Sequence, residues 1–403
     1  MTLDLDEFVE KVDALGGPNS PEAHKYWASF NYELQTRVDQ NLDPFSEEYL
    51  EQQLAVYREL SGRSVDQHQN ELTDFALEDH VNAVHPYGND QSPTEIALHY
   101  MRLADVVRSA EIGPGAKALD LGCGWGMTSE FLAQLGCKVI GVDINPQFVE
   151  LVRRRAVRYN YPIRAIQGNF DTFDIDGAFD VVLFYECFHH VICPWLLVER
   201  ARSWLGPNGK LILAGEPIQS NWWRNWGLRM DPLSLYCIRK YGWFESGWSK
   251  EFLVQMFNRA GYFVEISEGH KPEVGMTVIA SLGAKLSGAR LQRIPSLDGW
   301  FSDGEHLVST GSSRFEINVP SDPGQIALRI NNFRGEVIKL KVNSGKEKLL
   351  AVQLQPGENI LRIPLNPGTH LLTFQSDTWV PRAQLGTNDD RRMSFHLREI
   401  CTA

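Results

Sequence analysis

The 403-residue sequence lacks several features that would assign it to a large class at once. Its six cysteines form no C-x-x-C pair and no metal-ligand spacing, which is typical of reduced thiols rather than of a disulfide framework. No stretch approaches the roughly 18 apolar residues that a membrane-spanning helix needs, and the first residues are acidic without an apolar signal segment. These absences predict a cytoplasmic location and no membrane span.

Positive charge is scarce in the first part of the chain. Residues 1–90 contain 19 Asp and Glu against 5 Lys and Arg, a net charge of −14, whereas the whole chain has −12. No cluster of lysine and arginine elsewhere supplies the counter-charge that a phosphate backbone requires. The sequence therefore predicts that nucleic acid is not a partner.

A glycine-rich segment, Asp-Leu-Gly-Cys-Gly-Trp-Gly at residues 120–126, lies between an apolar run and a helix-like stretch. Its alternating glycines let the chain turn from strand to helix and let a ligand contact bare backbone. The loop is not G-x-G-x-x-G and no Gly-Lys-Ser/Thr follows it, so a phosphate ligand is disfavoured. Asp143 ends the next strand-like run, roughly 20 residues further on, where a carboxylate can accept hydrogen bonds from ribose hydroxyls. These features predict a nucleoside site, and the acid that opens the loop favours a ligand with a cationic group.

Strand-like and helix-like stretches alternate between about residues 111 and 284. The continuous apolar run at 179–185 is typical of a buried parallel strand. The alternation predicts a doubly wound α/β sheet. The expected strands are 118–119, 139–143, 162–168, 179–185, 211–216, 262–266 and 276–281, and the expected helices are 128–135, 196–205 and 250–260, with a turn at 206–209.

The D-x-G-x-G-x-G loop with its strand-end acid resembles the class I S-adenosylmethionine-dependent methyltransferases over about residues 95–283. The resemblance implies a Rossmann-like core of seven strands whose last strand runs antiparallel, with S-adenosylmethionine as the cofactor. It also implies a cofactor site that comprises Asp120, Gly122, Cys123, Gly124, Gly126, Asp143, Ile144, Asn169, Phe170 and Tyr185.

The segment after the fourth expected strand carries candidate catalytic residues. His190 and His189 have an unperturbed pKa near ~6.5, which suits a base that accepts a hydroxyl proton around neutrality, and we favour His190. Glu186 is a candidate for positioning the methionine amino group, polarising a histidine or capping the turn. A structural role is the rival interpretation for each of the three.

A divalent metal ion is a further hypothesis for this segment. Glu186, His189 and His190 form an E-x-x-H-H arrangement that resembles the E-x-x-E-H of ubiquinone-pathway O-methyltransferases. His189 replaces the second acid, which lowers the charge of the site and weakens its affinity for Mg²⁺.

The N-terminal segment and an insertion within the core have sequence patterns of their own. Residues 1–110 read as an acidic helical cap with helices at 22–40, 46–61 and 93–109, and with a loop-rich stretch at 66–91. Tyr87, His99 and Tyr100 are candidates to line an acceptor site, with helical packing or a dimer surface as the alternative. An insertion at 217–250 within the core (111–284) holds five of the eleven tryptophans, which suit either sugar faces and apolar acceptors or a small hydrophobic subcore.

Alternating apolar residues and regular turn signals from residue 285 to 403 predict an antiparallel β-sandwich of seven or eight strands. Residues 376–395 resemble the end of β modules appended to bacterial glycosyltransferases and methyltransferases that build surface polysaccharides. We therefore expect O-methylation of a sugar hydroxyl, with the β domain docking a glycan or a glycosyltransferase partner. The alternatives are a methyltransferase for phenolic or natural-product acceptors whose β domain forms a homodimer, and a non-catalytic scaffold.

Overall fold

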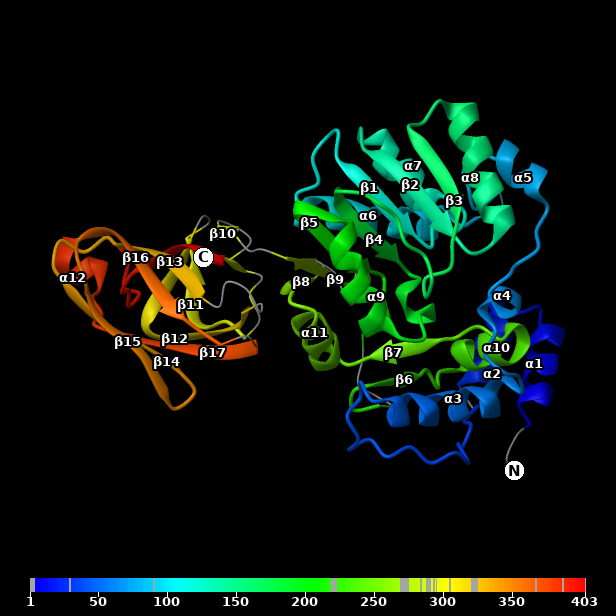
Figure 1. Cartoon of the computed structure of the whole chain (residues 1–403), viewed down its shortest axis with the longest axis horizontal. Coiled ribbons are helices and arrows are strands. Elements are labelled where there is room, and N and C mark those ends of the chain that lie inside the picture. Colours follow the sequence, from blue (N-terminus) through cyan, green and yellow to red (C-terminus); the bar gives the residue numbers. More distant parts are fainter. Residues whose placement is uncertain are drawn as a thin grey trace.

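The computed structural model shows an α/β body with the N-terminal helices (blue) and a β body built by the C-terminal residues (yellow to red; Figure 1). The structure describes residues 4–28, 30–89, 91–218, 223–268, 275–282, 285–287, 291–292, 294, 296–303, 306–319, 325–366, 368–385 and 388–402. Trp222 of the insertion lies outside the described residues.

A seven-stranded sheet forms the centre of the α/β body. Its order is β3-β2-β1-β4-β5-β9-β8, and β9 runs antiparallel to β5, whereas β1 to β5 run parallel to one another. The predicted doubly wound fold and its antiparallel last strand are confirmed. The strands are β1 (Lys117–Leu121), β2 (Lys138–Asp143), β3 (Ile163–Gln167), β4 (Phe179–Tyr185), β5 (Leu205–Ala214), β8 (Phe263–Glu268) and β9 (Met276–Ser281).

Alternate residues of the central strands pack into two different cores. Val182 and Phe184 of β4 face α9 (Pro194–Arg200) and α11 (Lys250–Arg259), whereas Val181 and Leu183 face α6 (Pro93–Ala110) and α7 (Met127–Gln134). A further helix, α8 (Pro146–Tyr159), packs against β2 and β3. Because both faces of the strand are covered, its sequence has the continuous apolar character that predicted a buried parallel strand.

The connection into β5 differs from the prediction. The expected helix 196–205 ends at Arg200 and continues as a 3₁₀ turn, η2 (Ala201–Trp204), and the expected turn at 206–209 lies inside β5. Register jumps from Leu205, opposite Phe179, to Lys210, opposite Val181. A side chain at Gly209 would meet the Phe179 carbonyl oxygen at 2.5 Å, so the glycine allows the strand to bulge instead of turning away.

The N-terminal helices also differ from the prediction at one point. The expected helix 22–40 ends at Trp27, and residues 30–40 form neither helix nor strand. Tyr32, Leu34 and Val38 pack against the core at a spacing of two or four residues, which fits an extended chain as well as a helix. The Glu59 carboxylate accepts the backbone N–H groups of residues 35 and 36, which stabilises this non-helical path. The N-terminal helices are α1 (Leu5–Ala14), α2 (Pro21–Trp27), α3 (Glu47–Ser61), α4 (Gln67–Asn70) and α5 (Leu77–Asn82).

The aromatic insertion and the N-terminal helices share one core. Trp226 of β6 (Trp226–Leu228) and Trp248 of β7 (Ser246–Trp248) are fully buried, and α10 (Pro232–Tyr241) packs against α1 and α3. The Tyr49 hydroxyl on α3 donates to the Trp226 carbonyl at 2.7 Å. Most tryptophans of the insertion therefore stabilise its packing.

The C-terminal strands form a second, antiparallel sheet. The predicted antiparallel β domain is confirmed, although its strands form one continuous sheet, curled almost into a barrel, in the order β15-β14-β17-β12-β18-β13-β16, with β10 on β18 and β11 on β12 (Figure 1). Its bounds are β10 (Lys285–Ser287), β11 (Asp298–Ser302), β12 (Leu307–Val319), β13 (Gln325–Asn332), β14 (Ile338–Ser344), β15 (Glu347–Leu354), β16 (Gly357–Pro364), β17 (Gly368–Ser376), α12 (Pro381–Leu385) and β18 (His396–Thr402). Phe263 of β8 packs into the core of this domain, so the two bodies are in contact.

Across the described residues, we find no helix with the length and apolar character that crossing a bilayer demands.

Candidate active site

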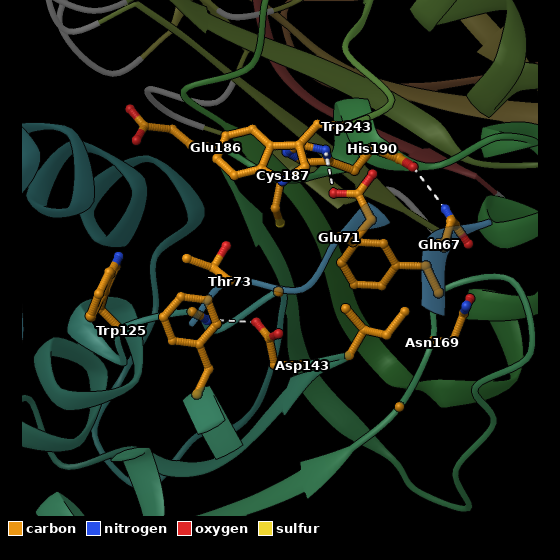
Figure 2. Close-up of a pocket in the computed structure, with 16 residues that line it drawn as sticks. Gln67, Glu71, Thr73, Trp125, Asp143, Asn169, Glu186, Cys187, His190 and Trp243 are labelled. Carbon is orange, nitrogen blue, oxygen red and sulfur yellow. Dashed lines mark hydrogen bonds and ion pairs between the residues drawn. The ribbon is translucent and has the colours of Figure 1, made fainter. Parts of the chain in front are cut away.

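A cavity of about 350 Å³ lies at the carboxyl ends of β1, β2, β3 and β4 (Figure 2). This edge is where doubly wound α/β folds bind ligands. The lining residues are Gln67, Glu71, Thr73, Gly122, Gly124, Trp125, Asp143, Ile144, Phe148, Gly168, Asn169, Phe170, Glu186, Cys187, His190 and Trp243.

The glycine loop forms the floor of the cavity. Gly122, Gly124 and Gly126 all have positive φ angles, which glycine adopts without strain. A Cβ at Gly122 would lie 2.6 Å from the Cys187 sulfur, so a larger residue at this position would collide with the next strand tip. The loop therefore presents bare backbone to a ligand, as its sequence predicted.

Asp143 joins the glycine loop to the tip of β2. Its Oδ2 accepts the Gly124 N–H at 2.8 Å, and its Oδ1 accepts the Asn145 N–H at 2.9 Å. Burial raises the pKa of this carboxyl to about 6, although the two backbone donors oppose that shift. The carboxylate lines the cavity with lone pairs that remain for ligand hydroxyls.

Asp120 lies behind the loop, where it is buried and does not line the cavity. One of its oxygens accepts the Ser129 hydroxyl at 2.6 Å, and the other has no partner among the described residues. Burial raises the pKa of this carboxyl to about 7. Any contribution of Asp120 to ligand binding is thus electrostatic or made through the loop.

The tip of β3 supplies one wall of the cavity. Asn169 and Phe170 both line it, and the Asn169 side-chain oxygen accepts the Asp171 N–H at 2.8 Å. That bond fixes the amide, whose NH₂ group carries two donors. Phe170 packs edge-on against Phe184 of β4.

Residues 67–75 of the N-terminal part form a covering segment, of which Gln67, Glu71 and Thr73 line the cavity. The Asn145 side chain donates to the Thr73 carbonyl at 2.7 Å, and the Gln67 side chain donates to the His190 carbonyl at 3.0 Å. Trp125 of the glycine loop packs against Phe75 at a ring separation of 4.6 Å. This stretch was expected to be loop-rich, and its sequence gave no signal that it contributes to the site.

Glu186 leaves β4 with a φ of 53°, a left-handed conformation that is uncommon outside glycine. Its carboxylate accepts a hydrogen bond from Arg102 of α6, and His99 of the same helix lies 3.7 Å from its other oxygen. Burial raises the pKa of Glu186, and the neighbouring Arg102 and His99 side chains oppose the shift. His99 also contacts the Tyr185 hydroxyl at 2.7 Å, so α6 holds the tip of β4 from outside the cavity.

The turn η1 (Phe188–His190) is organised by the buried carboxylate of Glu216. This group accepts the backbone N–H groups of Cys187, Phe188 and His189 and lies 2.9 Å from the His189 Nδ1 atom. The side chain of Glu216 is fully buried. His189 is therefore held by the protein on the far side of the turn, and it does not line the cavity.

His190 lines the cavity and pairs with Glu71 of the covering segment. Its Nδ1 atom lies 3.2 Å from the Glu71 Oε2 atom. Burial alone lowers the pKa of His190, but the charge and hydrogen bond of Glu71, together with the charges of Glu245 and Glu216, outweigh burial and raise the pKa to about 9. The expectation of an unperturbed pKa near ~6.5 is therefore wrong, because the sequence gave no sign that a carboxylate would meet this histidine.

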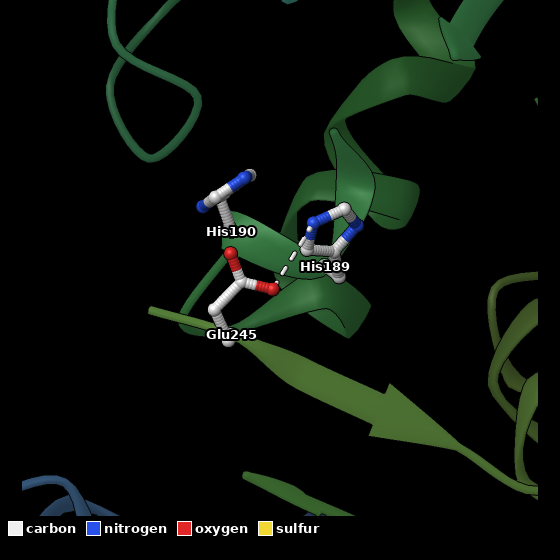
Figure 3. Close-up of side chains that lie close together, drawn as sticks. All are labelled: His189, His190 and Glu245. Atoms are coloured by element: carbon white, nitrogen blue, oxygen red, sulfur yellow. Dashed lines mark ion pairs between the residues drawn. The ribbon is translucent and has the colours of Figure 1, made fainter. Parts of the chain in front are cut away.

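The metal hypothesis named Glu186, His189 and His190, but Glu186 is not part of the compact ligand group. The group that the structure brings together is His189, His190 and Glu245, whose ligand atoms lie within 4.8 Å of one another (Figure 3). Glu186 is turned toward Arg102 instead. Glu245 follows α10, and its Oε2 atom lies 3.6 Å from the His189 Nε2 atom.

Eight residues that were predicted for the site line the cavity, and eight of the lining residues were not predicted. Gln67, Glu71 and Thr73 come from the covering segment, and Phe148 and Trp243 come from α8 and the insertion. The other three are Trp125, Gly168 and Cys187, which lie in segments that the sequence had singled out. Trp243 also had a signal, since the insertion was noted for its aromatic residues. The predicted residues that line it are Gly122, Gly124, Asp143, Ile144, Asn169, Phe170 and His190, joined by Glu186; Asp120, Cys123, Gly126, Tyr185 and His189 do not.

Comparisons with known proteins agree with this geometry. Residues 119–213 match the family model described as "Methyltransferase domain". A ubiquinone biosynthesis O-methyltransferase of Xanthomonas campestris is 33% identical over 151 residues, which are 36% of this chain and 61% of the relative. That of Xanthomonas axonopodis is 34% identical over 152 residues, with the same coverage. The chain thus spans about three-fifths of the length of these curated relatives.

Solved structures give a more distant likeness. The 1,6-didemethyltoxoflavin-N1-methyltransferase of Burkholderia thailandensis, with S-adenosylhomocysteine bound, has a TM-score of 0.36 and 19% identity, covering 47% of this chain and 79% of that one. An S-adenosylmethionine-dependent methyltransferase from Mesorhizobium loti has a TM-score of 0.36 and 17% identity, covering 45% and 98%. The sheet order, the glycine loop and the family match together lead to one conclusion: the chain contains a class I S-adenosylmethionine-dependent methyltransferase domain.

Proposed function

We propose that the protein is an S-adenosylmethionine-dependent O-methyltransferase whose acceptor is a sugar hydroxyl of a bacterial polysaccharide or another glycan. One observation carries the proposal. The glycine loop and Asp143, which suit a nucleoside, line the same cavity as the His190–Glu71 pair, which suits proton transfer.

The cofactor end of the cavity fits S-adenosylmethionine. Asp143 is an acceptor-only group whose two oxygens each retain a lone pair for a ribose hydroxyl. Gly122 and Gly124 leave the backbone open, and the Asn169 amide suits an adenine edge. When it is bound, the cofactor supplies a methyl group that its sulfonium already activates, so the protein aligns the acceptor and removes one proton.

His190 is the residue we assign to that proton. Its neutral form takes the proton of the acceptor hydroxyl, and the Glu71 carboxylate stabilises the imidazolium that results. His189, held by Glu216, positions the turn that carries His190. Glu186, held by Arg102 at the cavity wall, is our candidate for positioning the amino group of the cofactor.

The sugar acceptor is supported by the chemistry of the covering segment and the insertion. Gln67 and Glu71 offer hydrogen bonds to hydroxyl groups, and the flat face of Trp243 suits a sugar ring. The resemblance of residues 376–395 to polysaccharide-associated β modules adds support, and with it the hypothesis of a glycosyltransferase partner. A homodimer and a cytoplasmic location stay predictions from the sequence.

A phenolic acceptor is the second candidate. The curated relatives are named for O-methyl transfer in ubiquinone biosynthesis, and four aromatic side chains line the cavity. A planar aromatic acceptor would pack between such rings. The aromatic lining residues are Trp125, Phe148, Phe170 and Trp243.

Calorimetric titration with S-adenosylmethionine, with and without chelator, followed by assays of S-adenosylhomocysteine release, tests both candidates. We expect binding at a 1:1 ratio and release that depends on oligosaccharides. Release with phenols alone would select the second candidate, and chelator-sensitive turnover would assign an ion to the group of Figure 3. Absence of cofactor binding by folded protein would overturn both.

A further inference from the structure

Far from the cavity, the β domain brings two histidines and an aspartate together. Asp303 follows β11, His306 precedes β12, and His396 begins β18. One ligand atom from each lies within 4.8 Å of the other two. We propose that Asp303, His306 and His396 form a binding site for a divalent transition-metal ion of the zinc class, which ties the β11–β12 hairpin to the last strand.

Sheet register explains why these residues meet. His396 is paired with Val308 in the antiparallel ladder of β12 and β18, so the two side chains share a face of the sheet. His306 precedes Val308 by two residues and extends along that same face. Asp303 and His306 face each other across the end of the hairpin, where the Asp303 N–H donates to the His306 carbonyl at 3.2 Å.

The spacing of the donor atoms fits a metal ion. The Asp303 Oδ2 atom lies 3.4 Å from the His306 Nδ1 atom and 3.9 Å from the His396 Nε2 atom. Ligands at the usual zinc bond lengths of about 2.0–2.2 Å lie roughly 3.3 Å apart in tetrahedral coordination. Small rotations of the side chains would therefore close the site.

The donor set also selects the class of ion. Two imidazoles and one carboxylate suit Zn²⁺, Co²⁺, Ni²⁺ or Fe²⁺, whereas Mg²⁺ and Ca²⁺ prefer oxygen ligands alone. Three protein ligands leave at least one position for water or another ligand.

The surroundings orient two of the ligands. The His306 N–H donates to the Asp303 Oδ1 atom at 2.7 Å, which leaves Oδ2 toward the histidines. The His396 ring packs against Phe333 at a ring separation of 4.0 Å. Arg391 interacts electrostatically with Asp303, and Arg398 with His396. The Arg391 guanidinium forms two hydrogen bonds with the Asp389 carboxylate, which offsets its charge.

Titration of the metal-free full-length protein with ZnCl₂ tests the site, and Co²⁺ absorption reports the nitrogen ligands. We expect one equivalent to bind at this site and its Kd to rise by more than about tenfold in His306→Ala and in His396→Ala. Bound Zn²⁺ should also raise the temperature at which the β domain unfolds, because the ion binds the folded state alone. The matched control is His370→Ala, which removes a histidine of β17 that contacts Asn366 and Ser344 instead.

Three outcomes would overturn the proposal. The first is the absence of binding by folded protein, and the second is binding that survives both single substitutions. Loss of binding in His190→Ala with retention in His306→Ala would assign the ion to the active-site group and would also overturn it. His306→Gln keeps a polar side chain of similar size, so it repeats the test if the alanine variant fails to fold. S-adenosylmethionine affinity should be unchanged in His306→Ala, which separates this proposal from the proposed function.

Discussion

Individual side chains at the cavity owe their chemistry to neighbours that are distant in sequence. Glu71 and His190 are separated by 119 positions, yet their charged atoms lie 3.2 Å apart. Asp143 depends instead on its own loop, because Gly124 and Asn145 provide its backbone donors. The electrostatic environment of His190 thus depends on tertiary contacts, whereas the hydrogen bonds of Asp143 depend on local sequence.

Replacement of Asp143 tests the cofactor end. Asp143→Ala should weaken S-adenosylmethionine binding by about 1.5–3 kcal/mol, since charge-assisted hydrogen bonds to ribose are lost. Isothermal calorimetry measures the change. Asp176→Ala, which alters an exposed acid nearby in sequence, is the control and should leave the affinity as it was. An unaltered Kd in the Asp143 variant would remove this residue from the cofactor site.

The raised pKa of His190 predicts how the methyl-transfer rate depends on pH. Because the pKa is raised to about 9, the free base is scarce at neutral pH, and kcat/KM for the acceptor should rise with pH up to about that value. Glu71→Gln removes the largest of the negative charges that oppose burial, so the rising limb should move to lower pH by at least about one unit. Initial-rate measurements from pH 6 to 10 check this.

The two carboxylates that remain near His190, Glu216 and Glu245, also raise its pKa and are intact in that variant. The shift is therefore expected to be partial. If the rising limb of kcat/KM lies at the same pH in Glu71→Gln as in the unaltered protein, His190 does not take the proton.

At the scale of elements, a buried ion pair fastens the N-terminal part to the methyltransferase core. Arg155 of α8 and Glu130 of α7 are both buried, and Arg155 also donates to the carbonyls of His80 and Ala83. This one guanidinium joins two helices of the core to the end of α5.

Arg155→Met should lower the free energy of unfolding by about 3–5 kcal/mol, because Glu130 is left buried without a partner. Arg153→Met, on the exposed side of the same helix, should cost less than about 1 kcal/mol. Urea denaturation compares the two. Equal losses would show that burial of the pair is unimportant, and Arg155→Met with Glu130→Leu should recover most of the stability.

The whole molecule combines two bodies with separate cores. All residues that line the cavity lie between positions 67 and 243, whereas the core of the β domain is built by residues from 286 onward with Phe263 as the link. A chain that ends at residue 282 should therefore bind S-adenosylmethionine with a Kd within about threefold of the full chain. It should also unfold at a lower temperature, because Phe263 loses its cover.

Calorimetric titration and thermal unfolding of the shortened chain check that prediction. Circular dichroism establishes that the shortened chain is folded. Loss of cofactor binding in a folded shortened chain would mean that the β domain shapes the cavity.

The sequence by itself predicted those segments whose conformation depends on residues close by in the chain. Alternating strands and helices predicted the sheet, and the glycines at 122, 124 and 126 predicted a loop that exposes backbone, because these conformations depend on residues within the same turn. Periodicity was ambiguous at residues 30–40, where the apolar spacing fits an extended chain and a helix alike.

Tertiary structure alone decided the groups that come from separate segments. Glu71, Glu216 and Glu245 reach the two histidines from the covering segment, the end of β5 and the insertion, and no local pattern marks them. The same holds for His306 and His396, which sheet register brings together across 90 positions. The physical reason is that pKa values and ligand sets follow from distances in space, and the fold sets those distances.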